Sequence, residues 1–280
     1  MSPSARPSRP PRPSLWRRLA DALRRRAEAR ALARRAIPDD LWKRTLVRYP
    51  FLQRRDPALA AELRRLTSLF LDAKEFSAAG GLVLRNDIVV AIAAQACLPV
   101  LRLGLDRYDD FVGIVVHPGA VVARRHATDE TGVVHEYDET LAGEAMARGP
   151  VMLSWQDVRA AGQRRSGAAY NVVVHEFAHV LDLADGASNG TPRLPPDLPA
   201  AEWAAVMADE FARFVAQVDA DGASVLDPYG THGEDEFFAV ASEAFFVAPG
   251  PLKDERPALY ALFARYYLQD PLAEGRFDAP

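Results

Sequence analysis

Apolar residues along this chain follow a helical period in several long segments and a β-branched pattern in only a few short ones. Residues 57–72 (PALAAELRRLTSLFLD) carry a leucine-rich stripe that predicts an amphipathic helix. Residues 87–103 are more uniformly apolar and predict a buried helix that bends or breaks near Pro99. The same reasoning predicts further helices over residues 15–36, 168–184, 200–219, 234–247 and 257–268.

Strand signals occur between these helical segments. The run FVGIVVHPG, residues 111–119, is β-branched and ends in Pro-Gly, which predicts a strand followed by a turn. Residues 131–137 and 150–155 are shorter strand candidates. Helices before and after a small mixed sheet indicate an α+β fold.

The N-terminal segment differs in composition from the rest of the chain. Its first fourteen residues include five prolines, and residues 1–37 hold eleven arginines against Asp21 and Glu28. The whole chain has a net charge of −4, so residues 38–280 are acidic. We expect residues 1–37 to be a basic extension, disordered to partly helical, and residues 38–273 to be the folded domain. A solvated tail is the preferred interpretation, and contact with nucleic acid or an anionic membrane is a weaker alternative.

The sequence shows neither a transmembrane run of about 18 apolar residues nor an apolar secretory signal. Its one cysteine, Cys97, lies in an apolar stretch and is expected to be a buried hydrophobic residue. These features favour a cytoplasmic protein.

Polar residues interrupt the apolar segment VVVHEFAHVLD, residues 172–182. On a helix, His175 and His179 lie one turn apart on the same face, where both can bind one zinc ion at about 2.0–2.1 Å. Glu176 then lies close enough to act on a metal-bound water, as in the H-E-x-x-H helix of zinc hydrolases. The alternative is a helix with two hydrogen-bonded core histidines.

A catalytic zinc site needs a third protein ligand. The apolar segment HGEDEFFAVASEAFF, residues 232–246, offers Glu236 and Glu243 seven residues apart on one helical face, and His232 just before the helix. Spacing alone leaves these candidates open.

The motifs HEFAHVLD, DPYG and EFFAVASEAFF resemble those of the Mlc titration factor A family, the glucose-regulated metallopeptidases. The segments ACLPVLRLGLDRYDDF and GPVMLSWQDV extend this resemblance to about residues 38–273. It implies a zincin-like metallopeptidase fold with a helical N-terminal part, a small mixed sheet, a zinc-binding helix and C-terminal helices. The catalytic region is also similar to that of anthrax lethal factor.

The resemblance implies one zinc ion per chain, held by His175, His179 and Glu236. It implies that Glu176 is the general base and that Tyr229, seven residues before Glu236, faces the metal and stabilises the oxyanion. Two further residues, one on each of these helices, are expected to support the site. Asp182 either orients an imidazole or ends its helix, and Glu243 supports the ligands from behind.

Two functions follow from this interpretation. The first is a zinc-dependent peptidase, with aminopeptidase and endopeptidase activity both open, acting on a peptide or protein substrate. A regulatory role through binding a transcriptional repressor of sugar-uptake genes is implied by the resemblance. The alternative is a non-catalytic module that binds the repressor and has a structural or regulatory zinc site.

Two further expectations concern the surroundings of the site. The strand VMLSW, residues 151–155, is expected to be an edge along which an extended peptide lies. The loop of residues 188–199 is a candidate lid by its position after the zinc helix.

Overall fold

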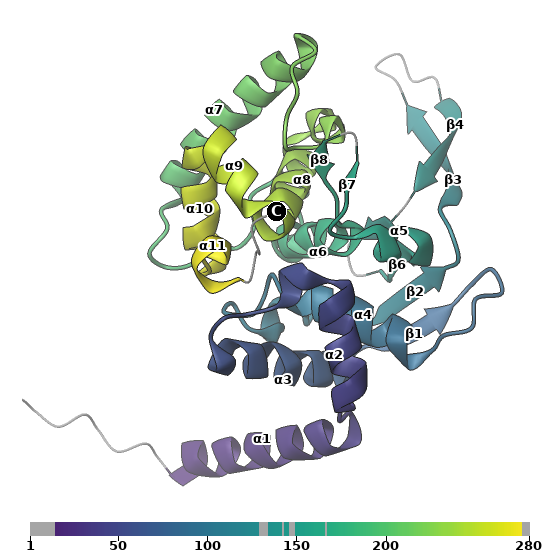
Figure 1. The fold of residues 1–280 in the computed structure, drawn as a ribbon, viewed down its shortest axis with the longest axis vertical. Helices are drawn as coiled ribbons and strands as arrows, with labels where there is room; N and C mark the ends of the chain where they lie inside the picture. The colour runs from purple at the N-terminus through teal and green to yellow at the C-terminus, as the bar shows by residue number, and fades with distance from the viewer. Residues whose placement is uncertain (1–14, 129–133, 142, 146–148, 166, 276–280) are drawn as a thin grey trace, which may run out of the picture.

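The computed structural model describes residues 15–128, 134–141, 143–145, 149–165 and 167–275. The chain begins with a helical part, continues through a small sheet and ends in a second group of helices (Figure 1). The first part contains α1 (Leu15–Arg34), α2 (Asp39–Arg48), the 3₁₀ turn η1 (Pro50–Leu52), α3 (Pro57–Ala73) and α4 (Asn86–Cys97). Within the described residues, no helix has the length and apolarity needed to span a membrane.

Helix α1 lies at one end of the molecule beside α3 (Figure 1). Two ion pairs join these helices. Arg34 Nη2 lies 2.7 Å from Asp72 Oδ2, and Arg65 pairs with Glu28. The helix predicted over residues 15–36 is confirmed over Leu15–Arg34, and its C-terminal half contacts α3.

The helix predicted over residues 87–103, with a bend or break near Pro99, is shorter in the structure. Helix α4 ends at Cys97, and turns follow to residue 103. Pro99 disfavours a helical residue before it and offers no N–H to continue the helix, so the break falls where the sequence places it. Cys97 is fully buried, as expected.

The main sheet has the strand order β1-β2-β6-β5. Strands β1 (Glu75–Ala78), β2 (Gly113–His117) and β6 (Val151–Ser154) are parallel, and β5 (Gly143–Ala145) pairs antiparallel with β6. The expectation that VMLSW forms an edge is therefore wrong, because β6 has a neighbour on each side. The two edge strands of the described sheet are β1 and β5.

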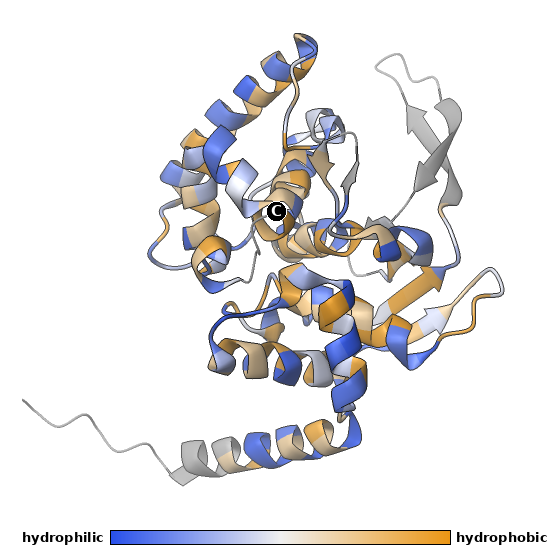
Figure 2. Ribbon diagram, in the orientation of Figure 1, coloured by the Kyte–Doolittle hydropathy of each residue, from blue (hydrophilic) through white to orange (hydrophobic). Residues whose placement is uncertain are grey.

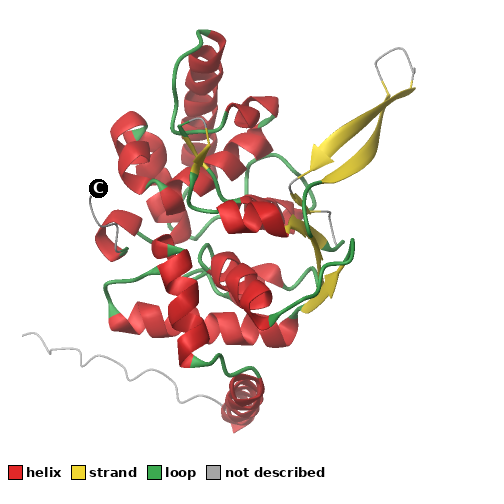
Figure 3. Cartoon of the chain, turned by 45° about the vertical axis from the view of Figure 1, so that its right-hand side comes forward, coloured by secondary structure: helices red, strands yellow, loops and turns green. Residues whose placement is uncertain are grey.

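A second pair of strands, β3 (Val121–Thr128) and β4 (Val134–Leu141), forms an antiparallel hairpin that projects from the body (Figures 1 and 3). The strand predicted at 131–137 corresponds to β4, although residues 131–133 lie outside the described residues.

Helix α6 (Val172–Asp182) starts four residues later than predicted. Ala168–Ala169 instead form β8, which pairs with β7 (Arg164–Arg165). Asn171 begins the helix, because its Oδ1 accepts hydrogen bonds from the N–H groups of Val173 and Val174, both at 3.1 Å. The short helix α5 (Trp155–Ala160) precedes this region.

The C-terminal helices pack around an aromatic core. They are α7 (Ala200–Asp219), α8 (Glu234–Val247), α9 (Pro249–Glu255), α10 (Pro257–Tyr267) and α11 (Pro271–Glu274), with the turn η4 (Pro228–His232) before α8. The predicted bounds of α7 and α8 are confirmed, and that of α10 is confirmed to within one residue. Trp203 of α7 stacks on Phe263 of α10 at 5.8 Å and contacts Phe238 of α8. Figure 2 shows β2 and much of α8 as apolar and the long α7 as mixed.

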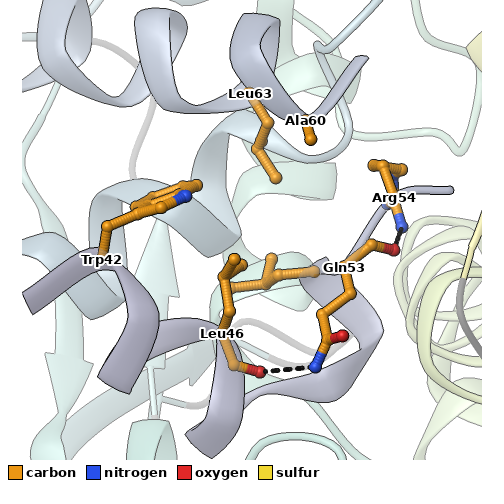
Figure 4. Close-up of a pocket in the computed structure, with 7 residues that line it drawn as sticks. Trp42, Leu46, Gln53, Arg54, Ala60 and Leu63 are labelled. Atoms are coloured by element: carbon orange, nitrogen blue, oxygen red, sulfur yellow. Dashed lines mark hydrogen bonds between the residues drawn. The ribbon is translucent and has the colours of Figure 1, made fainter. Parts of the chain in front are cut away.

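Helices α2 and α3 enclose a cavity of about 210 Å³ with η1 (Figure 4). Trp42, Leu46 and Leu63 supply its apolar wall. Arg54 lies buried at its other end, and its Nη1 donates to the carbonyls of Phe51 and Gln53, both at 2.9 Å. Burial lowers the pKa of Arg54 to about 10, so its side chain remains charged at neutral pH. Its hydrogen bonds to the two carbonyls cap the C-terminal end of η1.

A buried ion pair between Glu210 and Arg256 joins α7 to the junction of α9 and α10, with Oε2 and Nη1 3.1 Å apart. Removing one partner of such a pair leaves an uncompensated buried charge. We predict that Arg256→Met lowers the free energy of unfolding by about 3–5 kcal/mol in urea denaturation.

The matched control is Arg265→Met, because Arg265 also joins α10 to α7, through Glu202, but both side chains are more than 40% exposed. It should cost less than about 1 kcal/mol. Equal losses in the two variants would contradict the prediction.

Candidate metal centre

The packing of α6 against α8 brings together the side chains of His175, His179 and Glu236. The Nε2 atoms of the two histidines are 3.2 Å apart. Glu236 Oε2 lies 3.1 Å from His175 Nε2 and 3.4 Å from His179 Nε2. These three atoms therefore form a nearly equilateral triangle, with each side chain only 11–20% exposed.

This triangle fits a zinc ion. Ligand atoms at about 2.0–2.1 Å from a tetrahedral zinc are about 3.3–3.4 Å from one another, close to the observed separations. Glu236 Oε2 is buried and has no hydrogen-bond partner among the described residues. A bound cation would stabilise such a buried carboxylate oxygen, and two imidazoles and a carboxylate are a donor set that zinc accepts.

Electrostatics within the cluster favour a charged Glu236. Burial alone would raise its pKa, but the nearby imidazoles of His175 and His179 hold it well below its usual range. Burial would lower the pKa of His175, whereas Glu236 and Glu243 raise it well above its ordinary value. His175 and Glu236 therefore stabilise each other's charged forms across the 3.1 Å between Nε2 and Oε2.

Glu243 lies behind His175 on the side away from the triangle. Its Oε1 is 2.8 Å from His175 Nδ1, and its Oε2 accepts a hydrogen bond from the backbone N–H of Asn171. A carboxylate at Nδ1 fixes the ring orientation and leaves Nε2 directed at the triangle. The structure therefore places Glu236 with the two histidines and Glu243 one layer further out.

Glu176 is buried, with 4% of the residue exposed, and faces the edge strand β5. Burial raises the pKa of its carboxyl to about 7, while the charges of His175 and His179 act in the opposite direction. Gly143 of β5 lies so close that a Cβ atom there would be 2.6 Å from both Cγ and Cδ of Glu176. No motif in the sequence indicated Gly143.

Tyr229 stands at the exposed side of the cluster, on η4, with 39% of the residue exposed. Its ring centroid is 6.2 Å from that of His175. His232, the third-ligand alternative, packs edge-on against the Tyr229 ring at 4.6 Å. Among the described residues it does not belong to the metal-ligand group.

Asp182 is fully buried at the end of α6. Its Oδ2 accepts hydrogen bonds from the N–H groups of Asn189 and Gly190, both at 2.9 Å. Ser188 donates to Asp235 of α8, and the indole of Trp203 donates to the Gly190 carbonyl. These bonds connect the start of the loop after α6 to the end of α6, to α7 and to α8.

Comparison with known proteins gives the class to which this fold and site correspond. The model of the glucose-regulated metallo-peptidase M90 family matches residues 22–268, and the chain belongs to that family. The match begins inside the basic N-terminal segment.

Three relatives illustrate the similarity. An uncharacterized protein of Synechocystis is 35% identical over 226 residues, covering 80% of this chain and 82% of the relative. Mlc titration factor A of Pectobacterium atrosepticum is 34% identical over 216 residues, covering 76% and 80%. Mlc titration factor A of Klebsiella pneumoniae is 33% identical over 238 residues, covering 84% and 88%. The resemblance seen in the sequence motifs is thereby confirmed.

The geometry predicts a graded response of zinc affinity to substitution. Glu236→Ala and His179→Ala each remove a corner of the triangle and should abolish stoichiometric zinc binding. Glu243→Gln alters only the support behind His175 and should weaken affinity about 10–100-fold. Competition with a chromophoric chelator measures these affinities.

Glu234→Ala is the matched control, because Glu234 lies in the same first turn of α8 but is exposed. It should keep the wild-type affinity. Wild-type affinity in Glu236→Ala would refute the assignment of this triangle.

Proposed function

We propose that this protein is a zinc-dependent peptidase in which His175, His179 and Glu236 hold the metal. The observation that carries the proposal is the largely shielded triangle of two imidazole nitrogens and one carboxylate oxygen, with the buried Glu176 one residue from its first corner. A structural zinc site would use four protein ligands, whereas the described residues offer three. Family membership supports a metallopeptidase. We further propose a zincin-like arrangement, with the metal-binding helix beside an antiparallel edge strand.

The zinc ion would supply Lewis acidity, which lowers the pKa of a water molecule and polarises a carbonyl. Glu176 would accept the proton of that water and later deliver it to the leaving amine. Its burial and raised pKa suit a group that both takes and returns a proton near neutral pH. Tyr229, on the exposed side, would donate a hydrogen bond to the oxyanion.

The edge strand β5 gives an extended peptide a place to bind. It lies next to Glu176 and pairs with β6 on only one side among the described strands. A peptide added along the other side would pass close to the general base, with main-chain hydrogen bonds providing affinity. Parallel assays with aminoacyl reporters and N-terminally blocked peptides would separate aminopeptidase from endopeptidase activity.

Glu176→Gln tests the catalytic reading. The substitution keeps shape and volume but removes the base, so kcat for a peptide reporter should fall about 10²–10⁴-fold while zinc content stays near wild type. Undiminished hydrolysis at full zinc occupancy would show that Glu176 is not the base.

Gly143→Ala tests the packing of β5 against Glu176. The new methyl group would overlap the Glu176 side chain, which can move aside at little cost in stability but would then leave its catalytic position. We predict that kcat falls at least about tenfold with the melting temperature and zinc affinity nearly unchanged.

Gly119→Ala is the control, since a Cβ there would meet only Gln156 Oε1, at 3.4 Å. It should leave kcat unchanged. Full activity in Gly143→Ala would show that Glu176 does not depend on this contact.

A second proposed role is binding of a transcriptional repressor. The support is the name Mlc titration factor A carried by two relatives, together with the implication of the sequence resemblance. Co-purification of a repressor of this class with wild type, Glu176→Gln and His179→Ala would test it. Binding retained in both variants would place the repressor surface away from the metal, and failure of wild type to bind would reject the role.

A further inference from the structure

A second cavity, of about 320 Å³, lies between α2, the start of α4 and α5. It shares no lining residue with the candidate metal centre. In Figure 1, α5 lies above α2 and α4, beside α6. We call it the arginine cavity, because its lining includes Arg44, Arg48, Arg85 and Arg159.

The arginine cavity has an apolar floor and a charged rim. Leu41, Tyr49 and Ala91 are buried at its base, and Trp155 is a half-buried wall. The four arginines are exposed around this floor. Its volume lies at the lower end of the range, about 300–1,000 Å³, in which proteins bind small molecules.

Two of the four guanidinium groups have carboxylate partners. Arg44 Nη1 lies 2.7 Å from Asp40 Oδ2, and Arg85 forms two hydrogen bonds with Asp87, both at 2.9 Å. Those charges are already balanced.

Arg48 and Arg159 are different. In the described part of the chain, no carboxylate lies within ion-pair distance of either one. Arg48 Nη2 donates to the backbone carbonyl of Arg159 at 2.7 Å, which holds it across the gap between α2 and α5. The Arg159 guanidinium lies 6.0 Å from the centre of the Trp155 ring. Two positive charges without counter-charges therefore border one cavity with an aromatic wall.

We propose that the arginine cavity binds a small phosphorylated organic molecule. Arg48 and Arg159 would hold the phosphate group, since the planar guanidinium matches phosphate oxygens with paired hydrogen bonds. The organic part would lie against Trp155 and the apolar floor. The site is independent of the metal centre, so it provides a second ligand for this protein whether or not the peptidase proposal holds.

Titration calorimetry with phenyl phosphate tests the proposal on the zinc-loaded full-length chain at constant ionic strength. Wild type should bind one equivalent saturably, and the double variant R48Q/R159Q should bind at least about tenfold more weakly. The control R26Q/R30Q removes the same charge from exposed positions of α1 and should bind like wild type. Melting temperature and zinc content of both double variants should match wild type, which excludes misfolding as the cause.

Further titrations separate the contribution of the Trp155 ring from that of the phosphate contacts. Trp155→Leu should weaken phenyl phosphate but leave the affinity for inorganic phosphate unchanged, because only the ring contact is lost. Phosphate groups also bind zinc, so wild-type affinity retained in R48Q/R159Q would place the ligand at the metal and overturn the proposal. Absence of saturable binding to wild type, equal weakening in R26Q/R30Q, or equally tight binding of benzoate would overturn it as well.

Discussion

The carboxylate of Glu236 is the group on which the rest of the site depends. One of its oxygens is buried at 3.1 and 3.4 Å from two imidazole nitrogens, without a hydrogen-bond donor among the described residues. Water would ordinarily solvate such an oxygen, and its removal from water is costly unless a positive charge replaces it. A bound cation satisfies this constraint and also accounts for the two histidines in an otherwise apolar helix. In the absence of metal, the raised pKa of His175 provides part of the same compensation.

The fold maintains this arrangement because polar contacts join α6 and α8 at more than one point. Asn171 caps α6 with its side chain and donates its backbone N–H to Glu243 of α8. Glu243 also contacts the far nitrogen of His175. The start of one helix, the ring of a ligand and the middle of the other helix therefore share one buried carboxylate. At the other end of α6, Asp182 binds the loop that runs on to α7. These polar contacts fix the helices in register, while Phe177, Phe237 and Phe238 supply buried apolar area around them.

Much of this could be predicted from the sequence, for physical reasons that differ from residue to residue. The i, i+4 spacing of His175 and His179 is enough to define a shared helical face. The bounds of α7 and α8 follow from periodicity and from turn residues at their ends. The choice between Glu236 and Glu243 could not follow from spacing, because seven residues return to the same face. Only packing decides which carboxylate reaches the triangle and which lies behind the ring. Asn171 carried a usable signal, since an asparagine before an apolar helix is a common cap.

Other features lacked any local signal. Strand β5 is three residues long, and its importance lies in the contact of Gly143 with Glu176, which are far apart in sequence. The mistaken edge at VMLSW has the same origin, because a strand's place in a sheet is set by long-range pairing and not by its own pattern. The arginine cavity likewise combines residues from three helices that no single motif connects.

X-ray absorption at the zinc K edge, on protein reconstituted with one equivalent of zinc, tests the central claim most directly. The account predicts a first shell of nitrogen and oxygen only, at about 2.0–2.1 Å, with outer-shell scattering from two imidazoles. His179→Ala, which is expected to lose stoichiometric zinc binding, should retain no zinc with this first shell. A first shell that contains sulfur, a single imidazole in the wild type, or no retained zinc would contradict the proposal that His175, His179 and Glu236 bind the metal.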